Sequence, residues 1–175
     1  MSGHNKWSKI KRKKEAGDAK KGQVFSKLVR LITMEAKKCG GDANAPALRA
    51  AVEKARAENM PADNIERAIK KGKEPGENLE KITYEAYGPG GVGLIIEVLT
   101  DNKNRAVQEI KHLLSENGGN LSGPGSVVWA FKKENDEWVP QSTVPIPEED
   151  GQKLSELIEK LENIDDVQEV HANAE

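Results

Sequence analysis

Cysteine is nearly absent from this sequence, which contains only Cys39. A single thiol excludes an internal disulfide and any zinc site built from several cysteines. The sequence also lacks an apolar run approaching about 18 residues, the length that indicates a membrane-spanning helix. No apolar segment follows the basic residues at the start of the chain, so we expect no secretory signal. These absences favour a cytoplasmic protein that does not act at a membrane.

The residues that could carry catalysis or hold a metal lack the neighbours that such sites need. His4, His112 and His171 are far apart and have no cysteine or second histidine nearby, so we expect no metal site and no cofactor. No serine lies in a nucleophile-elbow motif. The segment GPGGVG matches a dinucleotide-binding fingerprint, but the strand-like LIIEVLT follows it where the fingerprint needs a helix. We therefore interpret GPGGVG as a hairpin turn, and expect neither an enzyme nor a small-molecule substrate.

The most prominent feature that is present is a charge asymmetry. The 175 residues carry a net charge of −2. Residues 1–73 nevertheless have 19 basic and 8 acidic side chains, whereas residues 74–175 have 8 basic and 21 acidic ones. Such a contrast between two halves indicates a partner of opposite charge, with nucleic acid the main candidate for the basic half.

In the basic half, apolar residues recur every three or four positions, as on the buried face of a helix. This spacing predicts three helices, over residues 23–38, 44–59 and 60–72. Asn44 is a plausible N-cap of the second helix, Pro61 suits the first turn of the third, and Gly72 suits a position just after its end. We expect residues 1–73 to form a small helical domain.

In the acidic half, segments with strand character alternate with segments of helical spacing. Strands are predicted over residues 81–88, 92–100, 125–133, 137–146 and 166–173, and helices over 101–119 and 147–164. The segment GGNLSGPGS is interpreted as a connector. This order predicts an α+β domain over residues 74–175, with both helices on one face of a mainly antiparallel sheet.

The basic segment at the start of the chain is the strongest candidate for a functional surface. If it is helical, its lysines at positions 6, 9, 13, 20 and 27 fall within an arc of roughly 60°, although Gly17 and Gly22 weaken a helix. A row of cations neutralises phosphates without reading the base sequence. We predict phosphate contacts from Lys6, Lys9, Lys11, Arg12, Lys13, Lys14, Lys20, Lys21 and Lys27, and stacking on a base or fixing of the N-terminus from His4 and Trp7. A merely solvated face and an attraction between the two halves are the alternatives.

The segment TDNKNRA is a second candidate. Asp101, Asn102 or Asn104 is expected to cap the helix that follows. The other interpretation is a second phosphate contact by Lys103 and Arg105, because backbone amides at a helix N-terminus attract anions. The sequence leaves both open.

Several segments together resemble the YebC family, whose eukaryotic relatives include the mitochondrial translational activator of cytochrome c oxidase. They are GHNKWSKIKRKKEAGDAKKGQVFSKLVR, ARAENMPADNIERAIKKG, YEAYGPGGVGLIIEVLTDNKNRA, GGNLSGPGSVVWAF and DDVQEVHANAE. The resemblance implies an N-terminal helical bundle, a ferredoxin-like α+β sandwich and a third domain inserted into the second. Here VVWAFKK continues directly into ENDEWVPQSTVPI, so we expect the inserted domain to be missing near residues 132–137.

The resemblance also implies a role in gene expression, in one of two forms. One is a DNA-binding transcriptional regulator, and the other is a translation factor that binds the ribosome or its RNA and relieves stalling. We predict a monomeric, non-enzymatic regulator that binds nucleic acid, with DNA as the first choice of target. Lysine-rich contacts to the phosphate backbone suit duplex DNA and structured RNA alike. A protein-interaction module acting through the acidic domain is the remaining alternative.

Overall fold

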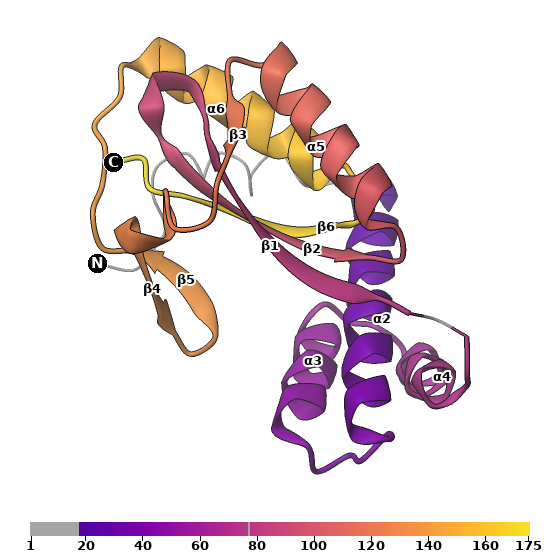
Figure 1. Cartoon of the computed structure of the whole chain (residues 1–175). Coiled ribbons are helices and arrows are strands. Elements are labelled where there is room, and N and C mark those ends of the chain that lie inside the picture. Colours follow the sequence, from indigo (N-terminus) through magenta and orange to yellow (C-terminus); the bar gives the residue numbers. More distant parts are fainter. Residues whose placement is uncertain (1–17, 77) are drawn as a thin grey trace. The chain divides into compact units, whose positions relative to one another are not determined.

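The structure, a computed structural model, describes residues 18–76 and 78–175, with side chains from Lys21 onward. These residues divide into a helical unit that ends at Glu80 and an α+β unit that begins at Lys81. Figure 1 shows the elements of each unit. None of the described helices has the length and apolar character needed to cross a bilayer.

The helical unit consists of three helices, as the apolar spacing predicts. They are α2 (Asp18–Cys39), α3 (Pro46–Ala57) and α4 (Ala62–Lys73). Helix α2 packs against both of the others (Figure 1). Their apolar faces enclose a core formed by Ile32, Ala36, Leu48, Ala51, Ala55, Met60, Ile65 and Ala68. Gly40 and Gly41 follow α2 with φ of 63° and 80°, which ends the helix as expected.

Two details of these helices correct the predictions. Ala45 rather than Asn44 is the N-cap of α3, and no described side chain caps that helix. Pro46 follows Ala45 at the first helical position, where its missing N–H group costs nothing. Gly72 lies inside α4 and is buried, not beyond the helix end. A Cβ atom at Gly72 would be 2.4 Å from the carbonyl oxygen of Thr33, so this glycine allows α4 to approach α2 closely.

The α+β unit contains a four-stranded sheet with the strand order β3-β1-β2-β6. The strands are β1 (Glu80–Tyr87), β2 (Gly93–Thr100), β3 (Asn120–Ser122) and β6 (Val167–Ala172). β1 pairs antiparallel with β3, and β2 pairs antiparallel with β6. Helices α5 (Lys103–Glu116) and α6 (Glu148–Glu162) cover one face of the sheet (Figure 1). The predicted fold class, α+β with helices on one face of an antiparallel sheet, is confirmed.

The main core lies between the sheet and the two helices. Alternate residues of β2, including Leu94, Ile96 and Val98, pack there against Ile110 of α5 and Leu157 of α6. The glycine-rich segment before β2 is the expected hairpin turn. It contains a short 3₁₀ helix, Pro89–Gly91, and leads into a strand, not a helix.

Three segments between α5 and α6 differ from the predictions. The segment interpreted as a connector contains β3, a three-residue strand too short to show an alternating pattern. The predicted strand over residues 125–133 begins instead as a 3₁₀ helix, Val128–Ala130, and only then becomes β4 (Phe131–Glu134). The next predicted strand is shortened to β5 (Glu137–Pro140).

β4 and β5 form a separate two-stranded hairpin. Asn135 and Asp136 form its turn and have φ of 50° and 65°, as the two central residues of a tight hairpin turn require. The hairpin belongs to a second apolar cluster, in which Phe131 and Trp138 pack with Ile95. Because side chains alternate along β2, Ile95 points to the sheet face opposite the helices.

A buried carboxylate organises the segment before this hairpin. Glu85 of β1 is 8% exposed, and it accepts hydrogen bonds from the backbone N–H groups of Gly125 (2.7 Å), Val127 (2.9 Å) and Val128 (2.6 Å). Burial by itself raises the pKa of a carboxyl group. The three N–H donors outweigh that effect and hold the pKa of Glu85 below its ordinary value.

Candidate nucleic-acid interface

Most of the predicted phosphate-binding residues fall outside the described part of the chain. These are His4, Lys6, Trp7, Lys9, Lys11, Arg12, Lys13 and Lys14, and their role stays a prediction. Lys20 belongs to α2, but its side chain is also outside the described ones. Lys21 and Lys27 lie in α2, and Lys103 and Arg105 lie in the first turn of α5.

The backbone of α2 keeps the predicted helical spacing. The helix continues through Gly22, where a Cβ atom would meet no described atom within 4 Å. Residues seven apart in a continuous helix lie about 20° from each other around the axis, so positions 20 and 27 share one side of α2. Lys21 is exposed and Lys27 is half-buried.

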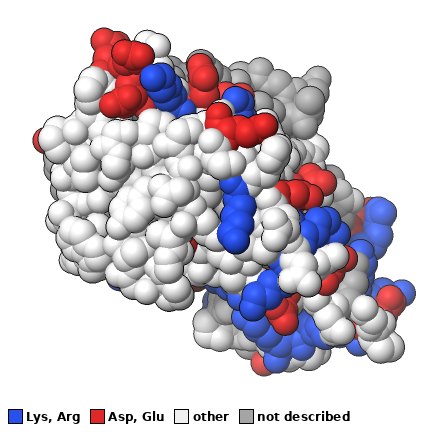
Figure 2. All heavy atoms as spheres, turned by 45° about the horizontal axis from the view of Figure 1, so that its top comes forward, with Lys and Arg blue, Asp and Glu red and all other residues white. Residues whose placement is uncertain are grey.

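The helical unit presents further cations that were not singled out from the sequence. Arg67, Lys70 and Lys71 follow one another at i, i+3 and i+4 along α4, and all three are exposed. The opposite face of α4 is buried through Ile65 and Ala68. On the face seen in Figure 2, Lys and Arg side chains gather over the helical unit with some Asp and Glu among them, whereas the visible face of the α+β unit has a wide uncharged area bordered by Asp and Glu and a few basic side chains. These cations could have been found from the sequence, because Arg67, Lys70 and Lys71 form the charged face of an amphipathic helix.

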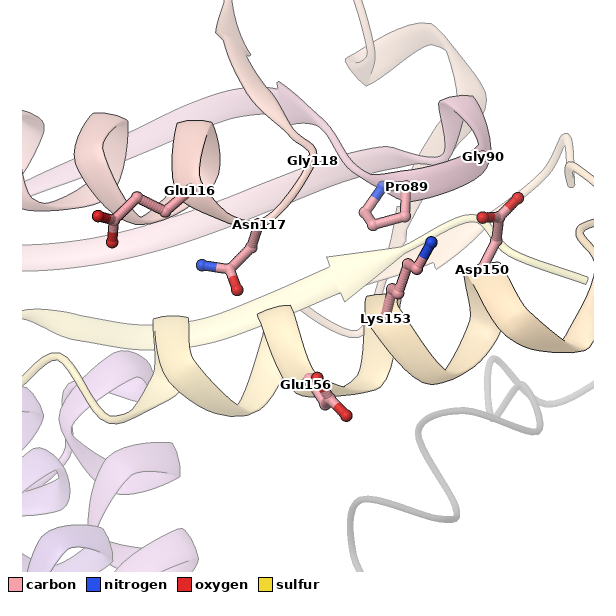
Figure 3. A pocket seen from close by; sticks show the side chains of 8 residues that line it. All are labelled: Pro89, Gly90, Glu116, Asn117, Gly118, Asp150, Lys153 and Glu156. Atoms are coloured by element: carbon pink, nitrogen blue, oxygen red, sulfur yellow. The ribbon is translucent and has the colours of Figure 1, made fainter.

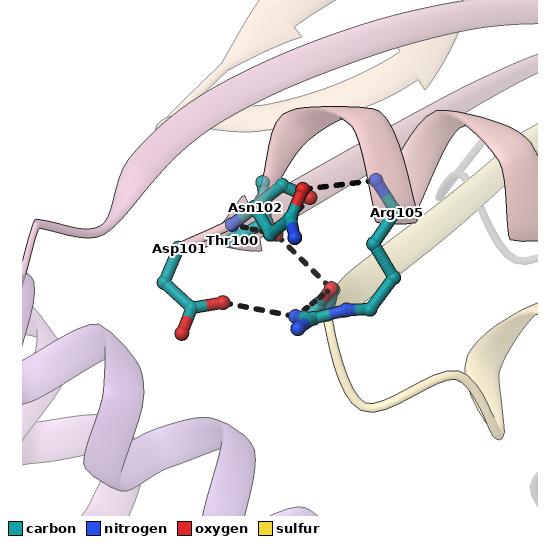
Figure 4. A network of polar contacts seen from close by, with 5 residues as sticks. Thr100, Asp101, Asn102 and Arg105 are labelled. Carbon is teal, nitrogen blue, oxygen red and sulfur yellow. Dashed lines mark hydrogen bonds and ion pairs between the residues drawn. The ribbon is translucent and has the colours of Figure 1, made fainter.

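The start of α5 is held by a compact polar network (Figure 4). The Asn102 side chain caps the helix by accepting a hydrogen bond from the Arg105 N–H at 3.1 Å. Arg105 Nη2 lies 2.9 Å from both Asp101 Oδ1 and Asp166 Oδ2. The Asp166 side chain is only 4% exposed and also accepts a hydrogen bond from Thr100 Oγ1 at 3.0 Å.

These contacts favour capping over phosphate binding as the role of this segment. Hydrogen bonds to Asp166 and Asp101 occupy Nη2 of Arg105 and raise the pKa of its guanidinium above the ordinary value. Lys103 is exposed on the same turn. A phosphate contact by Lys103 and Arg105 stays a prediction, and Asp101 would oppose it by repelling an anion.

The α+β unit has an open polar pocket of about 510 Å³ beside the glycine-rich turn (Figure 3). Three carboxylates, those of Glu116, Asp150 and Glu156, line it together with Lys153. The described lining includes no serine, cysteine or histidine side chain that could act as a nucleophile.

A cluster that the sequence did not suggest lies on the sheet face opposite the helices. It brings together Glu97 of β2 and Glu169 and His171 of β6. His171 Nε2 is 3.2 Å from Glu169 Oε2 and 3.8 Å from Glu97 Oε2. Burial alone lowers the pKa of an imidazole, but contacts with Glu169 and Glu97 raise the pKa of His171 to about 9. The strand register creates this cluster, so spacing along the chain could not reveal it.

Comparisons with known proteins identify the family to which a chain with these two units belongs. The model of the TACO1/YebC protein N-terminal domain matches residues 5–75. The model of the TACO1/YebC second and third domain matches residues 79–136 and 133–174. The chain belongs to the TACO1/YebC family. The resemblance noted in the sequence is thereby confirmed.

Bacterial members of the YebC family are close relatives of the chain. A probable transcriptional regulatory protein of Syntrophus aciditrophicus is 40% identical over 237 positions, covering 99% of this chain and 95% of the relative. One of Petrotoga mobilis is 52% identical over 161 positions, covering 90% of this chain. The match spans only 61% of that Petrotoga relative's length.

The YebC-type fold is also found in a solved structure. The crystal structure of a conserved hypothetical protein from Aquifex aeolicus superposes with a TM-score of 0.81 at 33% sequence identity. The superposition covers 90% of this chain and 91% of the other. The similarity thus extends over both units.

Proposed function

We propose that this chain is a regulator of gene expression that binds the phosphate backbone of nucleic acid through its helical unit, and that it is not an enzyme. The row of exposed cations on α4, Arg67, Lys70 and Lys71, carries the proposal. Because the other face of α4 is buried, these side chains project outward from a rigid element. Cations so placed release counterions from a polyanion and give affinity without base preference. The names of the relatives, probable transcriptional regulatory proteins, support the regulatory role.

Duplex DNA is the target that we propose first, because the relatives are named for transcription. Ribosomal RNA is the alternative, since contacts to a phosphate backbone suit structured RNA equally. A competition experiment separates the two. The full chain is offered labelled duplex DNA and purified ribosomes together at about 150 mM salt, where weak surface attraction is largely screened. Retention on the duplex supports transcription, and retention on ribosomes supports a translation factor.

Charge reversal tests the site itself. We expect Arg67/Lys70/Lys71→Glu to lose most of the binding to either polyanion. A matched control, Lys111/Lys153/Lys160→Glu, changes the net charge equally but on the α+β unit, and it should bind nearly as the wild type does. Lys9/Lys13/Lys20→Glu tests the row predicted at the start of the chain. Wild-type affinity in both the α4 variant and the Lys9/Lys13/Lys20→Glu variant would overturn the proposal.

We also propose that the β4–β5 hairpin replaces the third domain of the family in this chain. The model for the second and third domain matches two segments that meet at residues 133–136, the hairpin turn. The alignment with the Syntrophus relative has 237 positions, more than the 175 residues of this chain. We further propose two domains, residues 1–73 and 74–175, which limited proteolysis would separate by cleavage near residue 74.

A further inference from the structure

The cluster of Glu97, Glu169 and His171 is separate from the row of cations on α4 that carries the proposed function. Glu97 pairs with Glu169 across β2 and β6, and His171 lies two residues further along β6, so the three side chains share one face of the sheet. One ligand atom from each lies within 4.8 Å of the others. None of the three residues belongs to the helical unit.

The two distances from His171 fit coordination of a shared ion. Zinc binds imidazole nitrogen and carboxylate oxygen at about 2.1 Å, so two ligand atoms are about 3.2 Å apart at a bond angle of about 100° and about 3.8 Å apart at about 130°. The measured separations from His171 Nε2 are 3.2 Å to Glu169 Oε2 and 3.8 Å to Glu97 Oε2. These angles lie on either side of the tetrahedral value.

His171 Nε2 is buried and has no hydrogen-bond partner among the described residues, although two carboxylates lie close to it. The contacts of Nε2 with Glu169 and Glu97 are close enough for ion pairs but lack the geometry of a well-aligned hydrogen bond. Once its proton is released, the Nε2 lone pair of His171 is directed between the two carboxylates, the position that a shared ion would occupy.

A neighbouring hydrogen bond orients one of the carboxylates of the cluster. The Trp138 indole N–H of the β4–β5 hairpin donates a hydrogen bond to Glu97 Oε1 at 3.2 Å, which leaves Oε2 facing His171. Such outer contacts orient metal ligands in proteins. The side chains of Glu97 and His171 are 12% and 19% exposed, whereas that of Glu169 is 47% exposed. The cluster is thus shielded on one side and accessible to an ion and water on the other.

We propose that Glu97, Glu169 and His171 bind a divalent transition-metal ion, with Zn²⁺ as the preferred ion. Imidazole together with carboxylate favours zinc over Mg²⁺ or Ca²⁺, which prefer oxygen ligands alone. Two carboxylates balance the charge of the ion, and the imidazole proton is released to solvent on binding. The bound ion would join β2 to β6 and, through Glu97 and Trp138, to the β4–β5 hairpin. This proposal departs from the expectation, made from the sequence, that the chain has no metal site.

Calorimetric titration of the full, untagged, EDTA-treated chain with ZnCl₂ tests the proposal. We expect saturable binding of a single ion and a higher unfolding temperature in its presence. His171→Ala and Glu169→Gln should each weaken binding by more than about 100-fold, the upper end for loss of an outer contact alone. Trp138→Phe should weaken it less, by about tenfold.

His112→Ala is the matched control, because His112 also faces a glutamate, with Nε2 3.3 Å from Glu116 Oε1, but on the exposed surface of α5. It should bind zinc as the wild type does. Thermal unfolding in EDTA establishes that each variant is folded. Because the Glu169 side chain is half-exposed, we expect Glu169→Gln to disturb the fold least. Absence of saturable binding by the wild type, or equal affinity in His171→Ala and His112→Ala, would overturn the proposal. The zinc titration contains neither DNA nor ribosomes. A negative result would therefore overturn the metal-site proposal and leave the nucleic-acid proposal unaffected.

Discussion

At the scale of single residues, Glu85 illustrates how a buried charge can stabilise a segment without regular structure. Its carboxylate satisfies three backbone N–H groups between Gly125 and Val128. Hydrogen bonds to a charged acceptor contribute about 1.5–3 kcal/mol each, and a donor left without a partner costs a similar amount. We expect Glu85→Gln to lower the free energy of unfolding at neutral pH by about 2–3 kcal/mol, as measured by urea denaturation.

The acid stability of the protein follows from the same residue. Because the pKa of folded Glu85 lies below its ordinary value of 4.5, the stabilisation is fully present above that pH. It is lost as the pH falls through the lower, folded value. Glu85→Gln should therefore show a smaller decline in stability in acid than the wild type. The exposed Glu80 of the same strand provides the control, since Glu80→Gln should behave as the wild type; equal acid profiles for all three proteins would contradict this account.

Arg105 offers a second residue-scale prediction, which separates a structural role from phosphate binding. Its guanidinium is held by Asp101 and the buried Asp166. We expect Arg105→Gln to lower the unfolding temperature and to leave nucleic-acid affinity nearly unchanged, because Asp101 and Asp166 already balance the charge of the guanidinium. The exposed Lys103 should show little effect on stability when changed to Gln. A loss of affinity in Arg105→Gln without a loss of stability would favour the phosphate contact instead.

At the scale of elements, two glycines in the helical unit have opposite roles. Alanine is favoured over glycine in a helix interior by about 1 kcal/mol, and at Gly22 a Cβ atom would meet no described atom within 4 Å. At Gly72 the same atom would be 2.4 Å from Thr33 O and 2.8 Å from Ala36 Cβ. Gly22→Ala should stabilise the protein slightly. Gly72→Ala should destabilise it by about 1–3 kcal/mol as α4 is pushed from α2. Denaturant unfolding of both variants checks these signs, and stabilisation by Gly72→Ala would show that the helices separate easily.

Elements with a clear apolar period could be predicted from the sequence, and contacts between elements could not. Within each helix of the helical unit, apolar residues recur every three or four positions because each helix buries its own apolar face, as Ile65 and Ala68 do in α4. The role of Gly72 depends on which helix packs against it. β3 has only three residues and exists because β1 offers it an edge. The cluster around His171 depends on the register between β2 and β6, which no local pattern records.

At the scale of the whole molecule, the two halves of the sequence carry opposite charge, and this sets the salt dependence of the proposed binding. Residues 81–175 contain 8 basic and 18 acidic side chains, so a polyanion should avoid the α+β unit and contact the helical one. If six phosphates are neutralised, the logarithm of the binding constant for duplex DNA should fall with the logarithm of salt concentration with a slope of about −5.

The change in this slope on single substitutions gives the number of phosphate contacts that each side chain makes. Each of Lys70→Gln and Arg67→Gln should reduce the magnitude of that slope by about 0.9 if the side chain neutralises one phosphate. Lys153→Gln removes the same charge from the α+β unit, where Lys153 pairs with Glu149 at 3.2 Å, and should leave the slope unchanged. Titrations of labelled duplex at several salt concentrations give these slopes directly. Equal slopes for all three variants and the wild type would mean that affinity comes from elsewhere in the chain, with the basic segment before α2 as the next region to test.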